Sequence, residues 1–310
     1  MQTRRTFMKS AAIAAVGVSA GSGLQAQEKQ SNLNMAPLAK EDDLFFSISL
    51  AQWSLNKALF GGELDNLDFP AYTKKNFDIH AVEYVNQFFK SAEKSYVKEL
   101  LQRTEDIDVK NVLIMVDREG NLGEVDESKR IEAVENHYKW VEAAQMLGCH
   151  SIRVNAGGKG TEEEVAYSAT RSLRELSQFA ADYGINVIVE NHGGYSSRAS
   201  WLVSVIRDTG MSNCGVLPDF GNFRVSRTEN YDLYVGIKEL MPLAKGVSAK
   251  SHDFDEEGNE TAKDFYRILK TVKDSGFRGY VGIEYEGSKL TQDDGILATK
   301  KLLVKAGQSV

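Results

Sequence analysis

From Leu44 onward the sequence repeats one pattern eight times: a short apolar segment, a polar turn and then an amphipathic segment. The apolar segments have the length and composition of buried strands, which we expect at 45–50, 81–85, 112–116, 151–154, 186–190, 215–218, 246–250 and 280–284. The amphipathic segments predict helices near 66–77, 91–105, 127–147, 161–183, 198–210, 229–241, 261–275 and 291–306. Eight such units without a break in composition predict an α/β fold, a single-domain (β/α)8 TIM barrel over residues 44–310.

The main rival architecture is an open, doubly wound parallel sheet. Dinucleotide-binding sheets of that kind carry a Gly-x-Gly-x-x-Gly turn after the first strand. Here the first expected strand runs instead into Ala51-Gln52-Trp53-Ser54. Helix boundaries also carry their own signals, because Thr161 and Glu164 form a capping-box pattern and glycines follow the expected helix ends at 148, 184 and 276. We therefore prefer the barrel.

The N-terminus has the composition of an export signal. A basic start with the pair Arg4-Arg5 precedes the apolar run 11–20, and small residues follow to about residue 26. The apolar run is too short to span a membrane, and the arginine pair is typical of twin-arginine signals. We expect a twin-arginine signal peptide at 1–26, recognition by that export machinery, a polar linker at 27–43 and a periplasmic protein that is not embedded in the membrane.

Charge and cysteine content restrict the class of partner. The net charge is −7 and the isoelectric point is near 5.4, which argues against nucleic acid as a partner. Cys149 and Cys214 are the two cysteines, and each precedes an expected strand. Two cysteines give no disulfide framework, so small buried side chains are the better interpretation.

Polar residues gather where the expected strands end, which in barrels of this kind is where chemistry takes place. The clearest case is Ile185-Asn186-Val187-Ile188-Val189, a mainly apolar stretch that leads directly into Glu190-Asn191-His192. Strand alternation places Ile188, Glu190 and His192 on one side. The same reading of the other strand ends gives Gln52, Trp53, Glu83, Tyr84, Asn86, Arg153, Asn155, Asp219, Asn222, Lys250, His252, Glu284 and Glu286.

Three of these residues, Glu190, Asp219 and Glu284, are carboxylates that should converge on one mouth. Converging carboxylates repel one another, so either a divalent metal or Lys250 together with Arg153 should hold them. His252 would add a neutral nitrogen ligand. Oxygen ligands with one imidazole suit Mn²⁺, Mg²⁺, Co²⁺ or Zn²⁺ without selecting among them.

The motifs after strands five to eight resemble those of the xylose isomerase-like sugar phosphate isomerase/epimerase family. They are Glu190-Asn191-His192, Pro218-Asp219-Phe220-Gly221-Asn222, Lys250-Ser251-His252-Asp253-Phe254-Asp255 and Gly282-Ile283-Glu284-Tyr285. The resemblance implies a divalent metal held by Glu190, Asp219, His252 and Glu284. Two positions depart from the pattern: Ser248 stands where members usually carry the third ligand, and Asn222 stands where epimerases often have a histidine.

The resemblance implies proton transfer at a carbon next to a sugar carbonyl, through an enediolate. Glu190 would remove the proton and Glu284 would return it. Lys250 or Arg153 would stabilise the developing oxyanion, although Lys250 is equally explained as a carboxylate-paired or solvated lysine. Because phosphorylated sugars are scarce outside the cytoplasm, an unphosphorylated or keto-sugar is the expected substrate.

Other strand-end residues are expected around the substrate, each with a structural alternative. His192 and Asn222 would contact substrate, and His192 is as readily a structural imidazole at the rim. Glu83 would contact substrate or form a salt bridge with Arg153. Trp53, with Phe88, would form a sugar-stacking wall or serve in packing.

Three other functions fit the same sequence. A metal-dependent lyase or hydratase of a keto-glycoside would use the same metal and base. A glycoside hydrolase would place two carboxylates at the mouth without a metal. A non-catalytic sugar-binding barrel is the third. Metal endonucleases of this barrel type use many histidines and a basic groove, which five histidines and the acidic net charge do not match.

Overall fold

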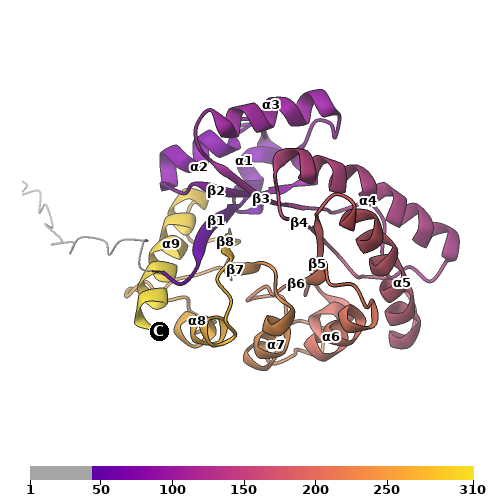
Figure 1. Cartoon of the computed structure of the whole chain (residues 1–310). Coiled ribbons are helices and arrows are strands. Elements are labelled where there is room, and N and C mark those ends of the chain that lie inside the picture. The colour runs from indigo at the N-terminus through magenta and orange to yellow at the C-terminus, as the bar shows by residue number, and fades with distance from the viewer. Residues whose placement is uncertain (1–43) are drawn as a thin grey trace, which may run out of the picture. The chain divides into compact units, whose positions relative to one another are not determined.

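The computed structural model describes residues 44–310, which form an eight-stranded sheet closed into a barrel (Figure 1). Parallel neighbours follow the order β6-β5-β4-β3-β2-β1-β8-β7. The strands are β1 (Ser47–Ala51), β2 (Ala81–Val85), β3 (Lys110–Met115), β4 (Ser151–Val154), β5 (Asn186–Glu190), β6 (Cys214–Leu217), β7 (Val247–Ser251) and β8 (Tyr280–Tyr285). The predicted α/β TIM barrel is confirmed. The expected signal peptide and linker lie outside the described residues.

Helices surround this barrel on its outer side (Figure 1). Those that follow β2 to β8 are α3 (Lys94–Glu105), α4 (Glu127–Leu147), α5 (Glu162–Ala181), α6 (Ala199–Asp208), α7 (Leu233–Leu240), α8 (Phe265–Asp274) and α9 (Gln292–Ser309). The capping box at α5 is present, since the Thr161 side chain accepts from the Glu164 backbone N–H and the Glu164 carboxylate accepts from that of Thr161. Gly148 caps α4 in the left-handed conformation at φ 72°.

The first connection is more elaborate than the sequence pattern predicts. After β1 the chain forms a 3-10 turn, η2 (Gln52–Leu55), and then two helices, α1 (Asn56–Gly61) and α2 (Phe69–Phe77). The helix α1 is short and buries none of its residues, so it has no amphipathic stripe from which to predict it. A second 3-10 turn, η3 (Asn86–Phe88), follows β2. Both turns lie at the mouth of the barrel, because each begins where its strand ends.

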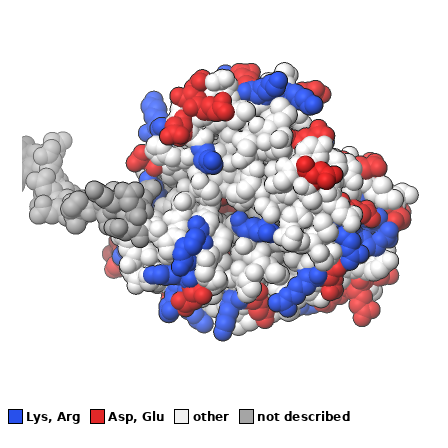
Figure 2. All heavy atoms as spheres, in the orientation of Figure 1, with Lys and Arg blue, Asp and Glu red and all other residues white. Residues whose placement is uncertain are grey.

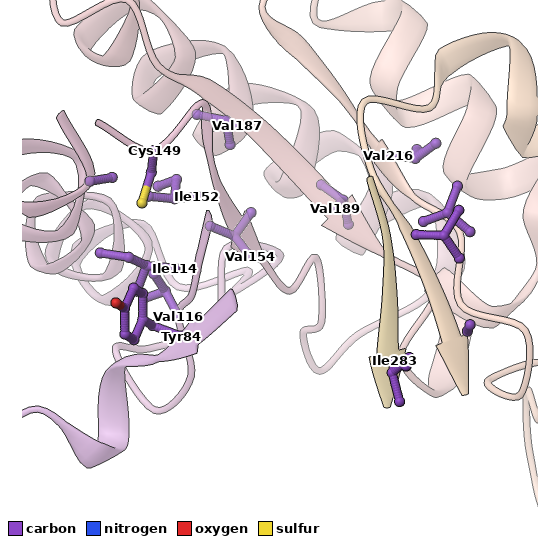
Figure 3. Close-up of a cluster of buried hydrophobic side chains, with 14 of the residues drawn as sticks. Tyr84, Ile114, Val116, Cys149, Ile152, Val154, Val187, Val189, Val216 and Ile283 are labelled. Atoms are coloured by element: carbon purple, nitrogen blue, oxygen red, sulfur yellow. The ribbon is translucent and has the colours of Figure 1, made fainter. Parts of the chain in front are cut away.

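Two apolar clusters show which way the strand side chains point. The larger cluster lies between sheet and helices and includes Tyr84, Val187, Val189 and Val216, as Figure 3 shows for part of it. The smaller cluster fills the barrel interior and includes Ala51, Val85, Met115, Ile188 and Leu217. Since Val187 and Val189 face outward and Ile188 inward, alternation directs Glu190 inward. Both cysteines are free and buried, as expected.

The barrel closes irregularly between β6 and β7. No regular ladder joins these strands among the described residues; isolated parallel bridges join Val216 to Ala244 and Asp219 to Ser248. Backbone hydrogen bonds run from Phe220 N to Ser248 O and from Ser248 N to Pro218 O. Because Pro218 donates no backbone hydrogen bond, β6 ends before it, and Asp219 begins the next loop at the mouth.

Candidate functional site

Three buried carboxylates meet at the carboxyl ends of the strands. Glu190 is the last residue of β5, Asp219 follows β6, and Glu284 lies one residue before the end of β8. One oxygen from each lies within 4.8 Å of the others, and all three side chains are buried. The convergence predicted from the sequence is therefore present, and it follows from parallel strands that end on one side of the barrel.

Strand β7 adds a hydroxyl and an ammonium to this cluster. Ser248 Oγ lies 2.9 Å from Asp219 Oδ2 and 2.9 Å from Glu284 Oε2. Because a hydroxyl has a single proton, it donates to one of these carboxylates at a time. Lys250 Nζ lies 3.3 Å from Glu284 Oε1, 3.6 Å from Asp219 Oδ2 and 3.4 Å from Glu286 Oε1. The sequence left open whether a metal or the pair Lys250 and Arg153 offsets the carboxylate charge. In the structure both side chains form ion pairs with carboxylates of the cluster.

Arg153 of β4 connects Glu190 to a residue that the sequence reading missed. Its Nε lies 3.0 Å from Glu190 Oε2, and its Nη1 donates to Asp117 Oδ1 at 2.7 Å. Asn155 Nδ2 donates to the same Asp117 oxygen, also at 2.7 Å. Asp117 follows the apolar segment 112–116, so the rule that identified the other strand-end residues would have found it had it been applied to the third strand.

The motif after β6 holds Asp219 and Glu190 in place. The Asn191 side chain fixes the backbone at the start of the loop after β6, because its Oδ1 accepts a hydrogen bond from Asp219 N and its Nδ2 donates one to Asp219 O. Asp219 Oδ1 accepts from the backbone N–H groups of Gly221 and Asn222, at 2.7 and 2.8 Å. The Asn222 amide then bridges the cluster: Nδ2 donates to Glu190 Oε1 at 2.9 Å, and Oδ1 accepts from Lys250 at 3.3 Å.

Burial and charge separate the two catalytic candidates. Burial raises the pKa of Glu190 to about 8, and the opposing effect of Arg153 does not cancel it. Burial would also raise the pKa of Glu284, but Lys250 and Arg153 outweigh it and hold that pKa below its ordinary value. Without a cation between them, Glu190 is therefore the more readily protonated of the two carboxyl groups and Glu284 the more readily ionised.

Glu83 lies in the barrel interior. It is buried, accepts a 2.6 Å hydrogen bond from Ser49 Oγ, and packs against Gly282 of β8. Burial raises its pKa to about 7, against the effect of the Ser49 hydrogen bond. The expected salt bridge with Arg153 is wrong, because the carboxylate partners of that guanidinium among the described residues are Asp117 and Glu190.

The two histidines do not join the carboxylate cluster. His252 lies past the end of β7, and its Nδ1 is 3.2 Å from Lys263 Nζ, which also donates to Glu260 Oε1 at 2.8 Å. The structure thus does not bring the predicted imidazole ligand to the carboxylates, because the chain leaves the strand and turns toward Lys263. His192 is exposed at the rim, and its backbone N–H donates to Ser196 Oγ.

Aromatic side chains lie beside the mouth. Trp53 and Phe88 both pack on the apolar cluster inside the barrel. Their ring centroids are 6.2 Å apart, and Phe60 of α1 joins them at 6.1 Å from Trp53 and 4.8 Å from Phe88. Phe60 is 59% exposed. The expected aromatic pair is therefore a cluster of three rings, of which that of Phe60 is exposed to solvent.

The ligand set fits a divalent cation of the hard type. Glu190, Asp219 and Glu284 supply carboxylate oxygens, and Ser248 Oγ is a further oxygen within the cluster. Glu190 Oε2 is buried and lies 3.0 Å from Arg153 Nε without a hydrogen bond from any described residue, so it can still accept a further contact. With no imidazole in the cluster, the donors match Mg²⁺ or Mn²⁺ better than Zn²⁺.

The surface around the barrel shows charges of both signs. On the face drawn in Figure 2, acidic and basic side chains alternate around the periphery, and the centre is mostly uncharged. None of the helices in residues 44–310 is long and apolar enough to cross a membrane.

Comparison with known proteins gives one curated relative and many structural neighbours. A stretch of 66 residues, 20% of this chain, is 41% identical to the C-glycoside deglycosidase alpha subunit of Arthrobacter globiformis, and the match spans 19% of that protein. The chain therefore spans about a fifth of the length of that relative.

Solved structures share the fold over most of the chain. L-ribulose 3-epimerase matches with a TM-score of 0.65 and 12% identity, over 85% of this chain and 95% of that one. A xylose isomerase-like TIM barrel protein from Mycobacterium smegmatis in complex with magnesium gives 0.64 and 16%, over 85% and 97%. The 3-keto-D-glucoside 4-epimerase of E. coli gives 0.60 and 14%, over 84% and 99%. At these identities the likeness concerns the fold.

The sequence family described as xylose isomerase-like TIM barrel matches residues 74–305. That range covers β2 to β8 whole and contains all three carboxylates of the cluster. The chain belongs to the xylose isomerase-like TIM barrel family.

Proposed function

We propose that this protein is a divalent-metal-dependent sugar isomerase or epimerase that moves a proton at a carbon next to a carbonyl. The observation that carries the proposal is the convergence of Glu190, Asp219 and Glu284 within 4.8 Å at the barrel mouth, backed by two buried cations. A hydrolase with two carboxylates would not need the third. The substrate class that we propose is an unphosphorylated or keto-sugar.

Glu190 is placed to accept the proton. Asn222 and Arg153 fix its two oxygens, at 2.9 and 3.0 Å, so the carboxylate cannot rotate away from the mouth. Because burial raises its pKa, Glu190 can accept a proton only in its ionised form, which the neighbouring Arg153 guanidinium favours and a bound cation would favour further. The bond between the sugar carbon and hydrogen breaks, the proton goes to Glu190, and the electron pair moves toward the carbonyl oxygen as an enediolate.

In an epimerisation Glu284 would take up a proton from solvent and return it to the opposite face of the sugar, while Glu190 later releases to solvent the proton that it accepted. Lys250 lies beside Glu284 and would offset negative charge on the sugar oxygens. Glu190, Asp219 and Glu284 would hold the metal. When bound, a divalent cation polarises the carbonyl and stabilises the negative charge on its oxygen. Asp117 and Asn155 act through Arg153 and keep its guanidinium directed at Glu190.

A second candidate function is elimination from a keto-glycoside. The 41% identity to a C-glycoside deglycosidase alpha subunit over 66 residues favours it. In a 3-keto-glycoside the same base removes the proton at C2, a C1–C2 double bond forms, and the bond from C1 to the aglycone breaks. The aglycone leaves with a proton. Isomerase and lyase thus share the first proton transfer and differ in the step after it.

We further propose that the chain is exported by the twin-arginine route and works in the periplasm. Arg4-Arg5 and the apolar run after it support this proposal. The test is cell fractionation of the full chain and of the Arg4→Lys/Arg5→Lys variant. Export is expected for the first and retention in the cytoplasm for the second. Periplasmic recovery of both proteins would contradict the twin-arginine route.

The experiment that tests the function combines metal content with proton exchange. Protein purified without added metal is analysed by plasma mass spectrometry and then incubated with p-nitrophenyl 3-keto-glucoside in deuterium oxide. We expect about one Mg, Mn, Co or Zn per chain, and deuterium next to the carbonyl. If the p-nitrophenyl group stays attached to the sugar, the enzyme is an isomerase or epimerase. If p-nitrophenol is released from the 3-keto-glucoside, the enzyme is a lyase.

The matched variant is Glu190→Gln/Asp219→Asn, which removes two of the three ligand carboxylates. It should lose both the metal and the exchange. A wild-type protein that stays free of metal after reconstitution and releases p-nitrophenol from the unoxidised glucoside would instead be a glycoside hydrolase. Sugar binding without exchange or metal would indicate the non-catalytic barrel.

A further inference from the structure

Lys250 lies inside the carboxylate cluster rather than at its edge. It belongs to β7, where it is paired with Glu284 of β8, and it is buried. Its ammonium lies 3.3 to 3.6 Å from three carboxylates, those of Glu284, Glu286 and Asp219. A lysine in this position is a cation built into the chain at the place where a metal would gather its ligands.

The ammonium and a metal would use the same oxygens. Asp219 and Glu284 are two of the three residues whose oxygens lie close enough to share an ion. Ser248 Oγ is also within 2.9 Å of both, so the side of the cluster that faces β7 is already partnered. Attraction between opposite charges at about 3.5 Å is strong when water is largely excluded.

The cluster nevertheless retains an excess of negative charge. Arg153 and Lys250 are its two cations. Their carboxylate partners are Asp117, Glu190, Asp219, Glu284 and Glu286. Five carboxylates against two cations leave three negative charges when all are ionised, so a divalent cation is still attracted. Lys250 therefore reduces the affinity for a metal without replacing it.

The ammonium also has partners to which it can withdraw. Asn222 Oδ1 accepts from it at 3.3 Å, and Glu286 Oε1 lies at 3.4 Å. Neither residue belongs to the three-carboxylate group. The Glu286 side chain is 30% exposed, so it marks the solvent side of the ammonium.

We propose that Lys250 is a built-in competitor of the metal: it holds Asp219 and Glu284 together in the metal-free protein and shifts toward Glu286 and Asn222 when a divalent cation binds. The proposal rests on the metal site proposed above. Its consequence is a reversible, weakened metal site whose affinity is set by a lysine that is not a ligand.

The test is calorimetric titration of chelator-treated protein with MnCl2 and with MgCl2. Lys250→Met keeps most of the side-chain volume and removes the charge, so it should bind metal about ten- to a hundredfold more tightly than wild type. Lys250→Arg keeps the charge and should not bind more tightly than wild type. Lys263→Met is the matched control, because Lys263 is also buried and paired with a carboxylate, Glu260, outside the three-carboxylate group.

Thermal unfolding supplies a second readout. Without metal, Lys250→Met should melt at a lower temperature than wild type, because three buried carboxylates then face one another with less compensation. The rise in melting temperature on adding MnCl2 should be larger than in wild type. If Lys250→Met does not fold without metal, Lys250→Gln, which keeps a polar end, takes its place in both measurements.

A double-mutant cycle tests the withdrawal of the ammonium. Glu286→Gln removes one of its alternative partners and should weaken metal binding in wild type, but much less in the Lys250→Met background. Equal effects in both backgrounds would overturn the withdrawal. Unchanged affinity in Lys250→Met, with wild type binding metal, would overturn the competition and leave the proposed function intact. Absence of metal binding in both proteins would overturn the metal site as well.

Discussion

The β-carbon that Gly282 lacks would lie 2.5 Å from Oε1 of Glu83 and 2.6 Å from its Oε2. Gly282 of β8 and Glu83 of β2 approach each other inside the barrel on either side of β1. Ser49 of β1 donates to the same carboxylate. A buried carboxyl group thus fits in the interior because the residue facing it has no side chain.

Gly282→Ala should destabilise the fold by about 1–3 kcal/mol, because the added methyl group overlaps a buried, hydrogen-bonded carboxylate. Urea unfolding measures the change. Gly157→Ala is the matched control, since an added β-carbon there meets no atom within 4 Å. In the double mutant with Glu83→Ala the cost of Gly282→Ala should largely disappear. Equal costs with and without Glu83 would show that the overlap is not the cause.

Arg153 is expected to act as a positioning residue for Glu190. Arg153→Met leaves Glu190 and Asp117 without their shared cation and should cost about 3 kcal/mol or more of stability. Exchange at the sugar carbon should slow at least about tenfold in kcat, because the base loses its orientation. Arg153→Lys should recover only part of the stability and of kcat, since an ammonium cannot contact both Asp117 and Glu190 as the guanidinium does. A change in KM with unchanged kcat would instead make Arg153 a substrate contact.

The barrel was readable from the sequence because its signals are local and repeated. β2, β4 and β5 have the expected bounds, and the other strands differ from the expected bounds by one or two residues at one or both ends. α4 also has the expected bounds. The connection after β1 was not readable. The helix α1 buries none of its residues, and both η2 and α1 depend on contacts with α9, such as the hydrogen bonds from Gln292 Nε2 to Ser54 O and from Ala58 N to Gln292 Oε1.

The site was readable in part, for a related reason. Strand ends and alternation are enough to place Glu190, Asp219 and Glu284 together. They do not give the path of the chain beyond a strand, which is why His252 was expected among the carboxylates and lies against Lys263 instead. Strand ends and alternation also do not show which charged side chains form ion pairs. The sequence suggested a salt bridge between Glu83 and Arg153, whereas in the fold the Arg153 guanidinium pairs with Asp117 and Glu190.

Stability should depend on pH through His137, a buried residue of α4 whose Nδ1 lies 2.6 Å from Ala133 O. Burial lowers the pKa of His137 below its ordinary value of about 6.5. The unfolded chain therefore binds a proton at a higher pH than the folded protein does. The stability that neutral His137 contributes is full above about pH 6.5 and is lost as the pH falls toward the lowered pKa, whereas the raised pKa values of Glu83 and Glu190 act in the opposite direction.

The measurement is the free energy of unfolding in urea at pH 7.5 and at pH 5.5. His137→Gln should reduce the loss between the two pH values. Burial also lowers the pKa of His150, so part of the loss should persist until that residue is replaced too. If the His137→Gln/His150→Gln double mutant loses as much free energy of unfolding between pH 7.5 and pH 5.5 as wild type does, other groups control the stability at acidic pH.

The exposed ring of Phe60 leads to a prediction about the aglycone of the substrate. With Trp53 and Phe88 it forms an apolar surface beside the mouth, and two of the three rings pack on the barrel interior. A sugar held at the carboxylates would extend its aglycone toward this surface. Ring stacking contributes about 0.5–1.5 kcal/mol, so Phe60→Ala should raise KM for p-nitrophenyl 3-keto-glucoside about two- to tenfold.

The change should depend on the aglycone, because methyl 3-keto-glucoside has no ring to stack and its KM should stay the same. Tyr167→Ala is the control, since Tyr167 is also an exposed aromatic residue, 67% exposed on α5, and should change neither KM. An equal rise for both glycosides in Phe60→Ala would mean that Phe60 supports the loop after β1 rather than the aglycone. In that case thermal unfolding should also show a lower melting temperature, whereas loss of stacking alone leaves it unchanged.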